Sequence, residues 1–352
     1  MSRLKKKTVI SIAWNFLEMF LTRGILIIST ILLSWFLAPE DFALLSMMAV
    51  FIQLANFSVD AGFSEALIRK KEVSQLELSS VFFVNIFFSF LIYTFFYFLA
   101  PIIAQIYQQP SLIELIRVVT LSVFFHAIFV VQKAILTREL KFKLQVKIAV
   151  PAVFISTILT VIFAYLDYGV WALIIQIVSN SFILALLYWR LNFWRPTFIF
   201  SLPALKELWQ FSKYLLVARY INIPFKNMYL IVLPKFFLAG PVGLYFFAEK
   251  AKDAMIGMLV KSIQTVTYPV LSQSQDDNEK LKRGYRIVVA TTSFLLMPVL
   301  LFLATLAPLL FEVFLPPSWF GAAIFLQLMC LTAILKPLNV SNYKLLMQHH
   351  QG

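Results

Sequence analysis

The chain has 352 residues, of which 61 % are apolar and only 13 % are charged, and its mean hydropathy is +0.85. A soluble fold of this length could not cover so much apolar surface, so the composition predicts an integral membrane protein. The formal net charge of +13 does not indicate nucleic-acid binding, because the basic residues fall between apolar runs and form no aromatic-interleaved patch. One cysteine, Cys330, excludes a disulfide framework.

Ten apolar stretches are long enough to cross a bilayer, since a spanning helix needs about 20 predominantly apolar residues. Six lie in the first half of the chain, near 11–37, 43–67, 79–106, 112–135, 145–166 and 170–190. Four more lie near 211–238, 244–272, 287–314 and 321–341. The pattern predicts an all-α, multi-pass membrane protein of about ten transmembrane helices, without an extramembrane domain.

The segment from Arg190 to Lys213 is the longest polar interruption in the first two thirds of the chain and contains Pro196 and Pro203. It separates six predicted helices from those that follow. We therefore expect an N-terminal six-helix lobe at 1–190, a cytoplasmic interlobe linker at 191–210 and a C-terminal lobe of about four helices at 211–352.

The basic residues of the gaps predict the orientation, because Lys and Arg are retained on the cytoplasmic side of short loops. Alternate gaps are rich in them, at residues 3–7, 69–71, 138–147, 190–206 and 280–286. The opposite gaps, near 38–41, 105–110, 167–169 and 316–319, carry almost none. Both termini are therefore expected in the cytoplasm, and the basic N terminus lacks a cleavage site, which predicts a retained first helix.

The motifs of common enzymes are missing from the sequence. No glycine-rich loop ends in Gly-Lys-Ser or Gly-Lys-Thr, so the chain is not expected to hydrolyse nucleotides. The histidines, His126, His349 and His350, do not form a cluster with metal-ligand spacing. We expect no catalytic residues, no metal and no cofactor, and hence a protein that is not an enzyme.

Charged residues inside the predicted helices are the informative ones, because each costs at least a few kcal/mol unless it faces water or a partner. The cations are Arg23, Arg219, Lys226 and Lys261, and the carboxylates Glu18 and Asp60 are candidates for ion pairing or ion coupling. A cavity lined by Arg and Lys would suit a phosphate or another anionic group. Alternatively, ion pairs with Glu18, Asp60 or Glu249 neutralise these cations, and the sequence leaves both readings open.

Several local strings, in the same order and between the same helices, resemble the polysaccharide-flippase branch of the multidrug/oligosaccharidyl-lipid/polysaccharide exporter superfamily. In the first half they are Leu37 to Phe42 (LAPEDF), Asp60 to Arg69 (DAGFSEALIR) and Arg138 to Phe142 (RELKF). In the second half they are Gly243-Leu244-Tyr245 with Ala248, Tyr268 to Ser272 (YPVLS), and Trp319 after a proline pair. The series covers essentially the whole chain.

The resemblance implies a V-shaped bundle of two six-helix lobes around a central cavity in the bacterial inner membrane. It implies a flippase that moves polyprenyl-pyrophosphate-linked oligosaccharides to the outer leaflet by alternating access, for lipopolysaccharide, O-antigen or other polysaccharide biosynthesis. The expected partners are this lipid-linked oligosaccharide, membrane lipid and other polysaccharide-assembly proteins. We expect Arg23, Arg219, Lys226 and Lys261 to bind the pyrophosphate, on the grounds of charge and depth. Asp60 and Gly62 are expected to shape the end of a helix.

The chain departs from the family pattern in two places. Around Lys226 to Tyr229 the family often has an acidic residue, and nearby glycines are replaced by Pro234 and Leu238. The family usually has at least two more helices after Asn339, so the second lobe is expected to be incomplete. The missing helices favour one alternative, a truncated, non-transporting subunit of a polysaccharide-assembly complex. The other alternative is a drug/cation antiporter of the same superfamily, which would depend on carboxylates such as Glu18 and Asp60.

Overall fold

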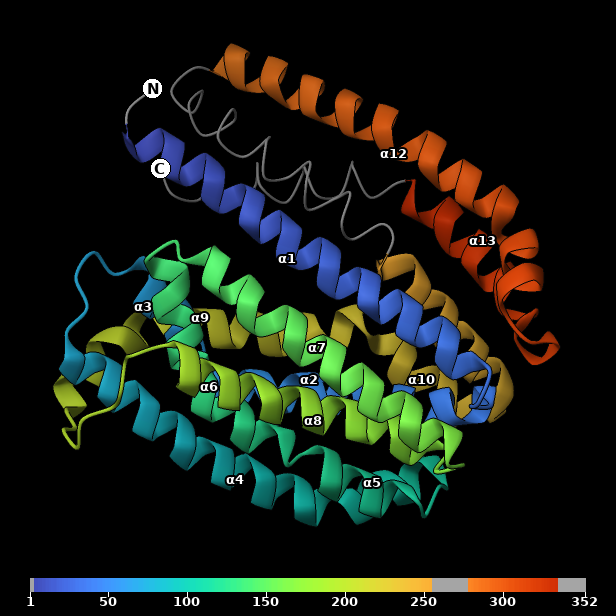
Figure 1. Cartoon of the computed structure of the whole chain (residues 1–352), viewed down its shortest axis with the longest axis horizontal. Helices are drawn as coiled ribbons and strands as arrows, with labels where there is room; N and C mark the ends of the chain where they lie inside the picture. Colours follow the sequence, from blue (N-terminus) through green and yellow to red (C-terminus); the bar gives the residue numbers. More distant parts are fainter. Residues whose placement is uncertain (1–2, 255–277, 335–352) are drawn as a thin grey trace. The chain divides into compact units, whose positions relative to one another are not determined.

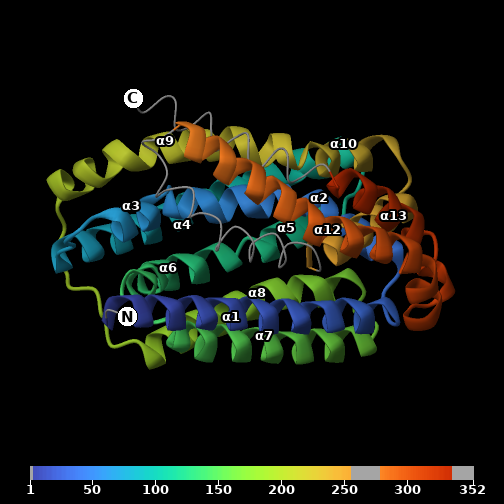
Figure 2. The same ribbon diagram turned by 90° about the horizontal axis from the view of Figure 1, so that it is seen from above.

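The computed structural model describes residues 3–254 and 278–334, and the regular elements within those ranges are helices. The chain divides into two compact units, Met1–Gly243 and Leu244–Gly352. Figures 1 and 2 show the helices of the first unit running side by side along its length. These helices are α1 (Arg3–Ser34), α2 (Pro39–Asp60), α3 (Phe63–Arg69), α4 (Gln75–Tyr107), α5 (Leu112–Val119), α6 (Ser122–Arg138), α7 (Phe142–Tyr165), α8 (Val170–Leu191), α9 (Leu202–Lys226) and α10 (Met228–Phe236).

Apolar helices match the first six predicted crossings. Seven helical stretches among the described residues are long and apolar enough to span a membrane. Six belong to the first unit, namely Ile10–Ser34, Pro39–Asp60, Gln75–Tyr107, Leu112–Arg138, Phe142–Tyr165 and Val170–Leu191. The prediction of an all-α, multi-pass membrane protein is confirmed.

The second predicted crossing, near 43–67, is interrupted where α2 meets α3. Ala61 and Gly62 both have a left-handed backbone, with φ of 47° and 81°. Two such residues in succession end α2 and turn the chain into α3, and glycine adopts this conformation without a steric penalty. A Cβ at position 62 would also lie 3.4 Å from the Ser212 carbonyl oxygen and from Leu215 Cβ. The bend therefore brings the chain close to α9.

The seventh predicted crossing, near 211–238, is two helices, and neither is among the stretches long and apolar enough to span a membrane. Asn227 lies between α9 and α10, and its side chain donates a 2.8 Å hydrogen bond to the Ile223 carbonyl. The helix also begins earlier than predicted, at Leu202, so the last nine residues of the expected 191–210 linker are helical. Pro203, which suggested a loop, stands in the first turn of α9, where a missing N–H costs nothing. Ser201 caps this turn by accepting from Ala204 N.

Three apolar clusters lie among the described residues of the first unit, and two of them bear on the position of α9 and the α2–α3 bend. One contains Met48, Val119 and Ile174 and joins α2, α4, α5, α6 and α8. The other contains Leu67, Val131 and Leu208 and joins α3, α4, α6 and α9. The helix α1 packs along α7. The second cluster, together with Gly62, places α9 against the α2–α3 bend.

Gly243 lies in a helical stretch at residues 239–254 and approaches α2 closely. A Cβ at this position would lie 1.7 Å from the carbonyl oxygen of Pro39, the first residue of α2. Such a distance is far inside van der Waals contact, so only glycine fits without a shift of the backbone. Pro39 and Gly243 belong to two of the sequence strings that carry the family resemblance.

The second unit contains α12 (Asn278–Phe314), the 3₁₀ turn η1 (Pro317–Trp319) and α13 (Ala322–Ala333). The helices α12 and α13 pack together. Trp319 is fully buried, and its ring lies 4.5 Å from that of Phe247. The segment Val289–Phe314 of α12 is the seventh apolar stretch and matches the predicted crossing near 287–314.

Candidate functional site

Polar and aromatic side chains join α2 and α3 to α9, and we name this contact the α2/α3–α9 seam. Its central contact is an ion pair in which Arg219 Nη2 lies 2.7 Å from Glu65 Oε1. The Arg219 guanidinium also stands 5.0 Å from the centroid of the Phe57 ring. Both side chains of the pair remain exposed, by 50 % and 37 % respectively. The guanidinium is therefore held in place while part of it stays open to a ligand.

An aromatic and hydroxyl surface borders this ion pair. Tyr220 shares a hydrogen bond with Ser58 across the seam, and its ring stands edge-on to Phe57 at 6.2 Å. On the same helix, Lys226 is exposed. Seven residues separate it from Arg219, which places the two cations within about 20° of each other around α9 and roughly 10 Å apart along it. Arg219 and Lys226 therefore share one face of α9.

The other sequence-predicted residues lie elsewhere. Arg23 and Glu18 are partly exposed residues of α1, and Figure 2 shows α1 and α9 on opposite sides of the first unit. The structure does not bring Arg23 into the seam. Lys261 lies outside the described residues.

Asp60 is buried at the last position of α2. Its carboxylate accepts hydrogen bonds from the Ser64 hydroxyl at 2.6 Å and from the Ser64 backbone N–H at 3.2 Å. These are the backbone-capping contacts expected where the helix ends beside Gly62. Among the described residues of the first unit, the partner of Arg219 is Glu65, and not the Glu18 or Asp60 considered from the sequence; Glu249 belongs to the second unit.

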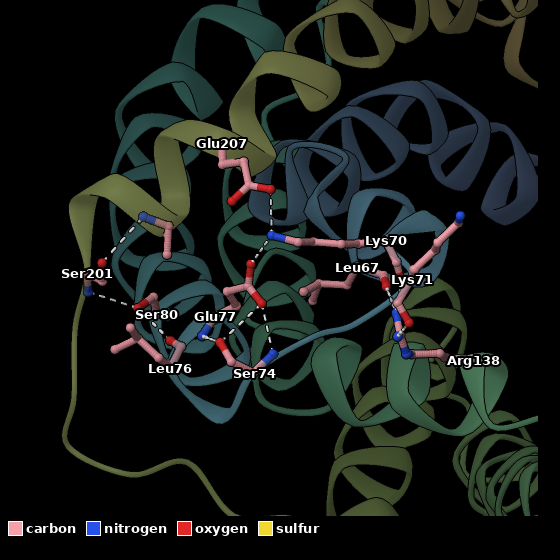
Figure 3. Close-up of polar contacts among 11 residues, drawn as sticks. Leu67, Lys70, Lys71, Ser74, Leu76, Glu77, Ser80, Arg138, Ser201 and Glu207 are labelled. Atoms are coloured by element: carbon pink, nitrogen blue, oxygen red, sulfur yellow. Dashed lines mark hydrogen bonds and ion pairs between the residues drawn. The ribbon is translucent and has the colours of Figure 1, made fainter.

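A second polar cluster lies where α3 ends and α4 begins (Figure 3). Lys70 Nζ lies 2.5 Å from Glu77 Oε1 and 2.6 Å from Glu207 Oε1, so it connects α4 with α9. Glu77 also accepts from Ser74 N at 2.8 Å, which completes a capping box at the start of α4. An open cavity of about 480 Å³ borders the cluster. The cluster fixes the start of α9 to the α3–α4 turn.

Arg138, the last residue of α6, supports the same turn from another side (Figure 3). Its guanidinium donates hydrogen bonds to the carbonyl oxygens of Leu67, Lys70 and Lys71. The last carbonyls of a helix have no partner within the helix, and a cation near them is favourable. Arg138 therefore closes α3 and joins it to α6.

The Lys70 cluster predicts a pH-dependent contribution to stability. Its hydrogen bonds with Glu207 and Glu77 raise the pKa of Lys70 above 10.5. The ion pairs of Lys70 therefore stabilise the fold fully at pH values below the pKa of Lys70 in the unfolded chain. This stabilisation is lost as the pH rises through the higher pKa of Lys70 in the folded protein. We expect Lys70→Gln to lower the free energy of unfolding by about 1 kcal/mol at pH 7, because the side chains are partly exposed. Thermal unfolding of the purified protein between pH 7 and 11 should show this difference shrink above pH 10.5.

Lys71→Gln is the matched control for that measurement, since Lys71 is the exposed neighbour and the change removes the same charge. It should leave the unfolding temperature almost unchanged at every pH. Equal curves for the two variants would contradict a stabilising role for the Lys70 ion pairs.

A partly exposed guanidinium and an exposed ammonium share one face of α9, with the Phe57 ring beside the guanidinium, and these are the groups that proteins use to bind phosphate oxygens. Among the described residues, no group of three or more His, Cys, Asp or Glu side chains could hold a metal ion. The sequence indicated Arg219 and Lys226 but not the contacts of Phe57, Ser58 and Tyr220. The partners of the central ion pair are 154 residues apart, and no local pattern reveals such a contact.

Comparison with known proteins identifies the family. A family model described as "polysaccharide biosynthesis protein" matches residues 32–324. The chain is 26 % identical to the lipopolysaccharide biosynthesis protein WzxC of Escherichia coli (strain K12), over 95 % of this chain and 68 % of that protein. It is 23 % identical to the teichuronic acid biosynthesis protein TuaB of Bacillus subtilis (strain 168), over 83 % of this chain and 61 % of the relative. The chain thus spans about two thirds of the length of these curated relatives.

Among solved structures, the lipid II flippase MurJ in an inward closed conformation has a similar fold. Its TM-score is 0.73 at 15 % sequence identity, over 95 % of this chain and 74 % of that one. This likeness concerns the fold alone. The matches confirm the resemblance inferred from the sequence strings, and the chain belongs to the polysaccharide biosynthesis protein family, with the fold of an all-helical, multi-pass membrane protein.

Proposed function

We propose that this protein is a flippase that moves a polyprenyl-pyrophosphate-linked oligosaccharide from the cytoplasmic to the outer leaflet of the bacterial inner membrane. The substrate would be a precursor of a cell-surface polysaccharide, and both chain termini would lie in the cytoplasm. Family membership supports this proposal, as do the names of relatives that act in lipopolysaccharide and teichuronic acid biosynthesis. The solved flippase of similar fold supports a transport mechanism of alternating access rather than catalysis.

One observation carries the proposal for the substrate site. Arg219 lies on the crossing predicted from the sequence near 211–238, although its helix α9 is not among the stretches long and apolar enough to span a membrane. It is half exposed, held by Glu65 and Phe57, and shares a helix face with Lys226. A guanidinium donates two parallel hydrogen bonds to phosphate oxygens, and a lysine adds a point charge. We assign the pyrophosphate to this pair, with Arg23 and Lys261 as further candidates.

The test is complementation in a bacterial cell that lacks its own polysaccharide flippase. The full chain should restore surface polysaccharide, measured by immunoblot, and membrane fractionation should confirm its insertion. Single changes of Arg23, Arg219, Lys226 and Lys261 to Ala then assess each cation. Export that survives all four changes would reject the cationic site but not the transport function.

Two other outcomes would reject transport of the lipid-linked saccharide. If the inserted chain fails to restore export, it is better described as a non-transporting subunit of an assembly complex. If it instead confers resistance to cationic drugs that depends on Glu18 or Asp60, it is a drug/cation antiporter.

A further inference from the structure

The connection between α8 and α9, residues 192–201, exposes aromatic side chains to an unusual degree, and we name it the α8–α9 connector. Phe193 is 94 % exposed and Phe198 is 98 % exposed. The connector has no regular secondary structure and lies outside the membrane-spanning stretches. Two rings this exposed on one short segment are available to an apolar environment outside the protein.

Hydrogen bonds hold the connector against the first turns of α4. Gln75 donates to the Arg195 carbonyl at 2.7 Å and accepts from Trp194 Nε1 at 2.7 Å. One turn later, Thr197 N donates to Ser79 Oγ at 3.0 Å. The next contact, in which Ser201 N donates to Ser80 Oγ at 3.0 Å, appears in Figure 3. The connector is therefore fixed along α4, and its phenylalanines are held in position.

The length of α4 sets the level of this segment relative to a bilayer. The helix has 33 residues, which is about 50 Å at 1.5 Å per residue, and a hydrocarbon core is about 30 Å thick. Part of α4 must therefore lie outside the hydrocarbon core, and its start, where Glu77 pairs with Lys70, is the charged end that suits the headgroup region. The Phe198 ring stacks on Phe83 at 5.7 Å, about 12 Å along the helix from its start. This places Phe198 near the boundary between headgroups and acyl chains, where aromatic rings are favoured.

Exposed cations flank the connector. Arg190 in the last turn of α8 and Lys206 in the second turn of α9 both face solvent. Arg195 differs, because its guanidinium donates to the carbonyl oxygens of Asn192, Trp194 and Trp189. Exposed cations beside exposed aromatic rings match the arrangement of an anionic lipid surface, with its phosphates above its acyl chains.

We propose that the α8–α9 connector is a lipid-docking surface. Phe193 and Phe198 insert at the headgroup–acyl boundary, and Arg190 and Lys206 bind the phosphates of anionic phospholipids in the same leaflet. Phe198 stacks on Phe83, and the exposed Phe87 and Phe90 follow four and seven residues after Phe83 on the same side of α4. Docking would hold the starts of α4 and α9 at one depth in the bilayer. The proposal does not depend on the substrate site proposed above.

A spin label at position 198 tests the depth. The full chain with Cys330→Ala and Phe198→Cys is labelled and reconstituted in vesicles of phosphatidylcholine and phosphatidylglycerol. We expect its collisions with oxygen to exceed those with a water-soluble nickel complex. A label at Glu72→Cys, an exposed residue of the α3–α4 turn, is the aqueous control and should show the reverse. A 198 label as accessible to nickel as the control, or one shielded from both reagents, overturns the proposal.

The charge requirement is tested by titrating phosphatidylglycerol into phosphatidylcholine nanodiscs and following a fluorophore attached to the Phe198→Cys protein. Each basic residue near an anionic surface contributes roughly fivefold to binding. The double change Arg190→Gln and Lys206→Gln should therefore weaken the response about 25-fold, whereas Lys213→Gln, further along α9, should not. A response to phosphatidylglycerol that is the same in both variants would exclude the two cations as headgroup ligands.

Discussion

Gly243→Ala is expected to destabilise the protein by about 3 kcal/mol, at the upper end of the usual cost of overpacking. The new Cβ would lie 1.7 Å from the carbonyl oxygen of Pro39. Neither partner can rotate away, because the obstacle is backbone. The backbone around Gly243 must therefore move away from the start of α2. Thermal unfolding of the purified protein in detergent measures the loss.

Gly24→Ala is the matched control, since a Cβ at position 24 of α1 would meet nothing within 4 Å. Alanine is the better helix former by about 0.5–1 kcal/mol, so this variant should melt at the same temperature as the parent or slightly higher. A Gly243→Ala protein that melts as high as Gly24→Ala would contradict the close approach of Gly243 to Pro39.

Arg219→Gln is expected to weaken the binding of a polyprenyl pyrophosphate by about 10- to 100-fold. Hydrogen bonds to charged groups contribute about 1.5–3 kcal/mol each, and about 1.4 kcal/mol corresponds to tenfold. Arg219→Lys should fall between the parent and Arg219→Gln, because it keeps the charge but loses the planar fork. The measurement is titration of the purified, reconstituted protein with undecaprenyl pyrophosphate.

Two variants separate this role from simple structural support. Lys213→Gln removes a cation that is exposed on the same helix and should leave the affinity unchanged. Glu65→Gln removes the partner of Arg219 and should leave the affinity equal or higher, since the carboxylate competes with the phosphate for the guanidinium. If Glu65→Gln weakens binding as much as Arg219→Gln, the ion pair supports the fold and is not a ligand site.

The sequence predicted the parts of the fold that depend on local composition. The first six crossings follow from the length of apolar runs, and the observed helices begin and end within a few residues of the predicted ranges except in the second, which ends at Asp60 rather than near residue 67. The interruptions were harder to predict. The α2–α3 bend needs a left-handed backbone at Ala61 as well as at Gly62, and alanine gives no sign of it. Pro203 suggested a linker but stands in the first turn of α9.

The candidate site could be predicted only in part. Hydrophobicity identified Arg219 and Lys226, because a cation within an apolar stretch is conspicuous. Their surroundings depend on α9 packing beside the α2–α3 bend, a contact between residues 154 positions apart. Glu65 was visible as a charge, but sequence alone could not distinguish it from Glu18 or Asp60 as the partner of Arg219.

The basic residues that indicate the orientation of the chain have a second use once it has folded. Lys70 lies between two carboxylates, and Arg138 and Arg195 each donate to three backbone carbonyls. Side chains whose charges are predicted to direct insertion would thus form ion pairs and hydrogen bonds at helix ends in the folded protein. A lysine could replace either arginine as a topological signal, but its three N–H donors lie on one nitrogen, whereas the guanidinium spreads five donors over a planar fork that reaches separate carbonyls. Correct insertion and correct assembly therefore impose different requirements on the same positions.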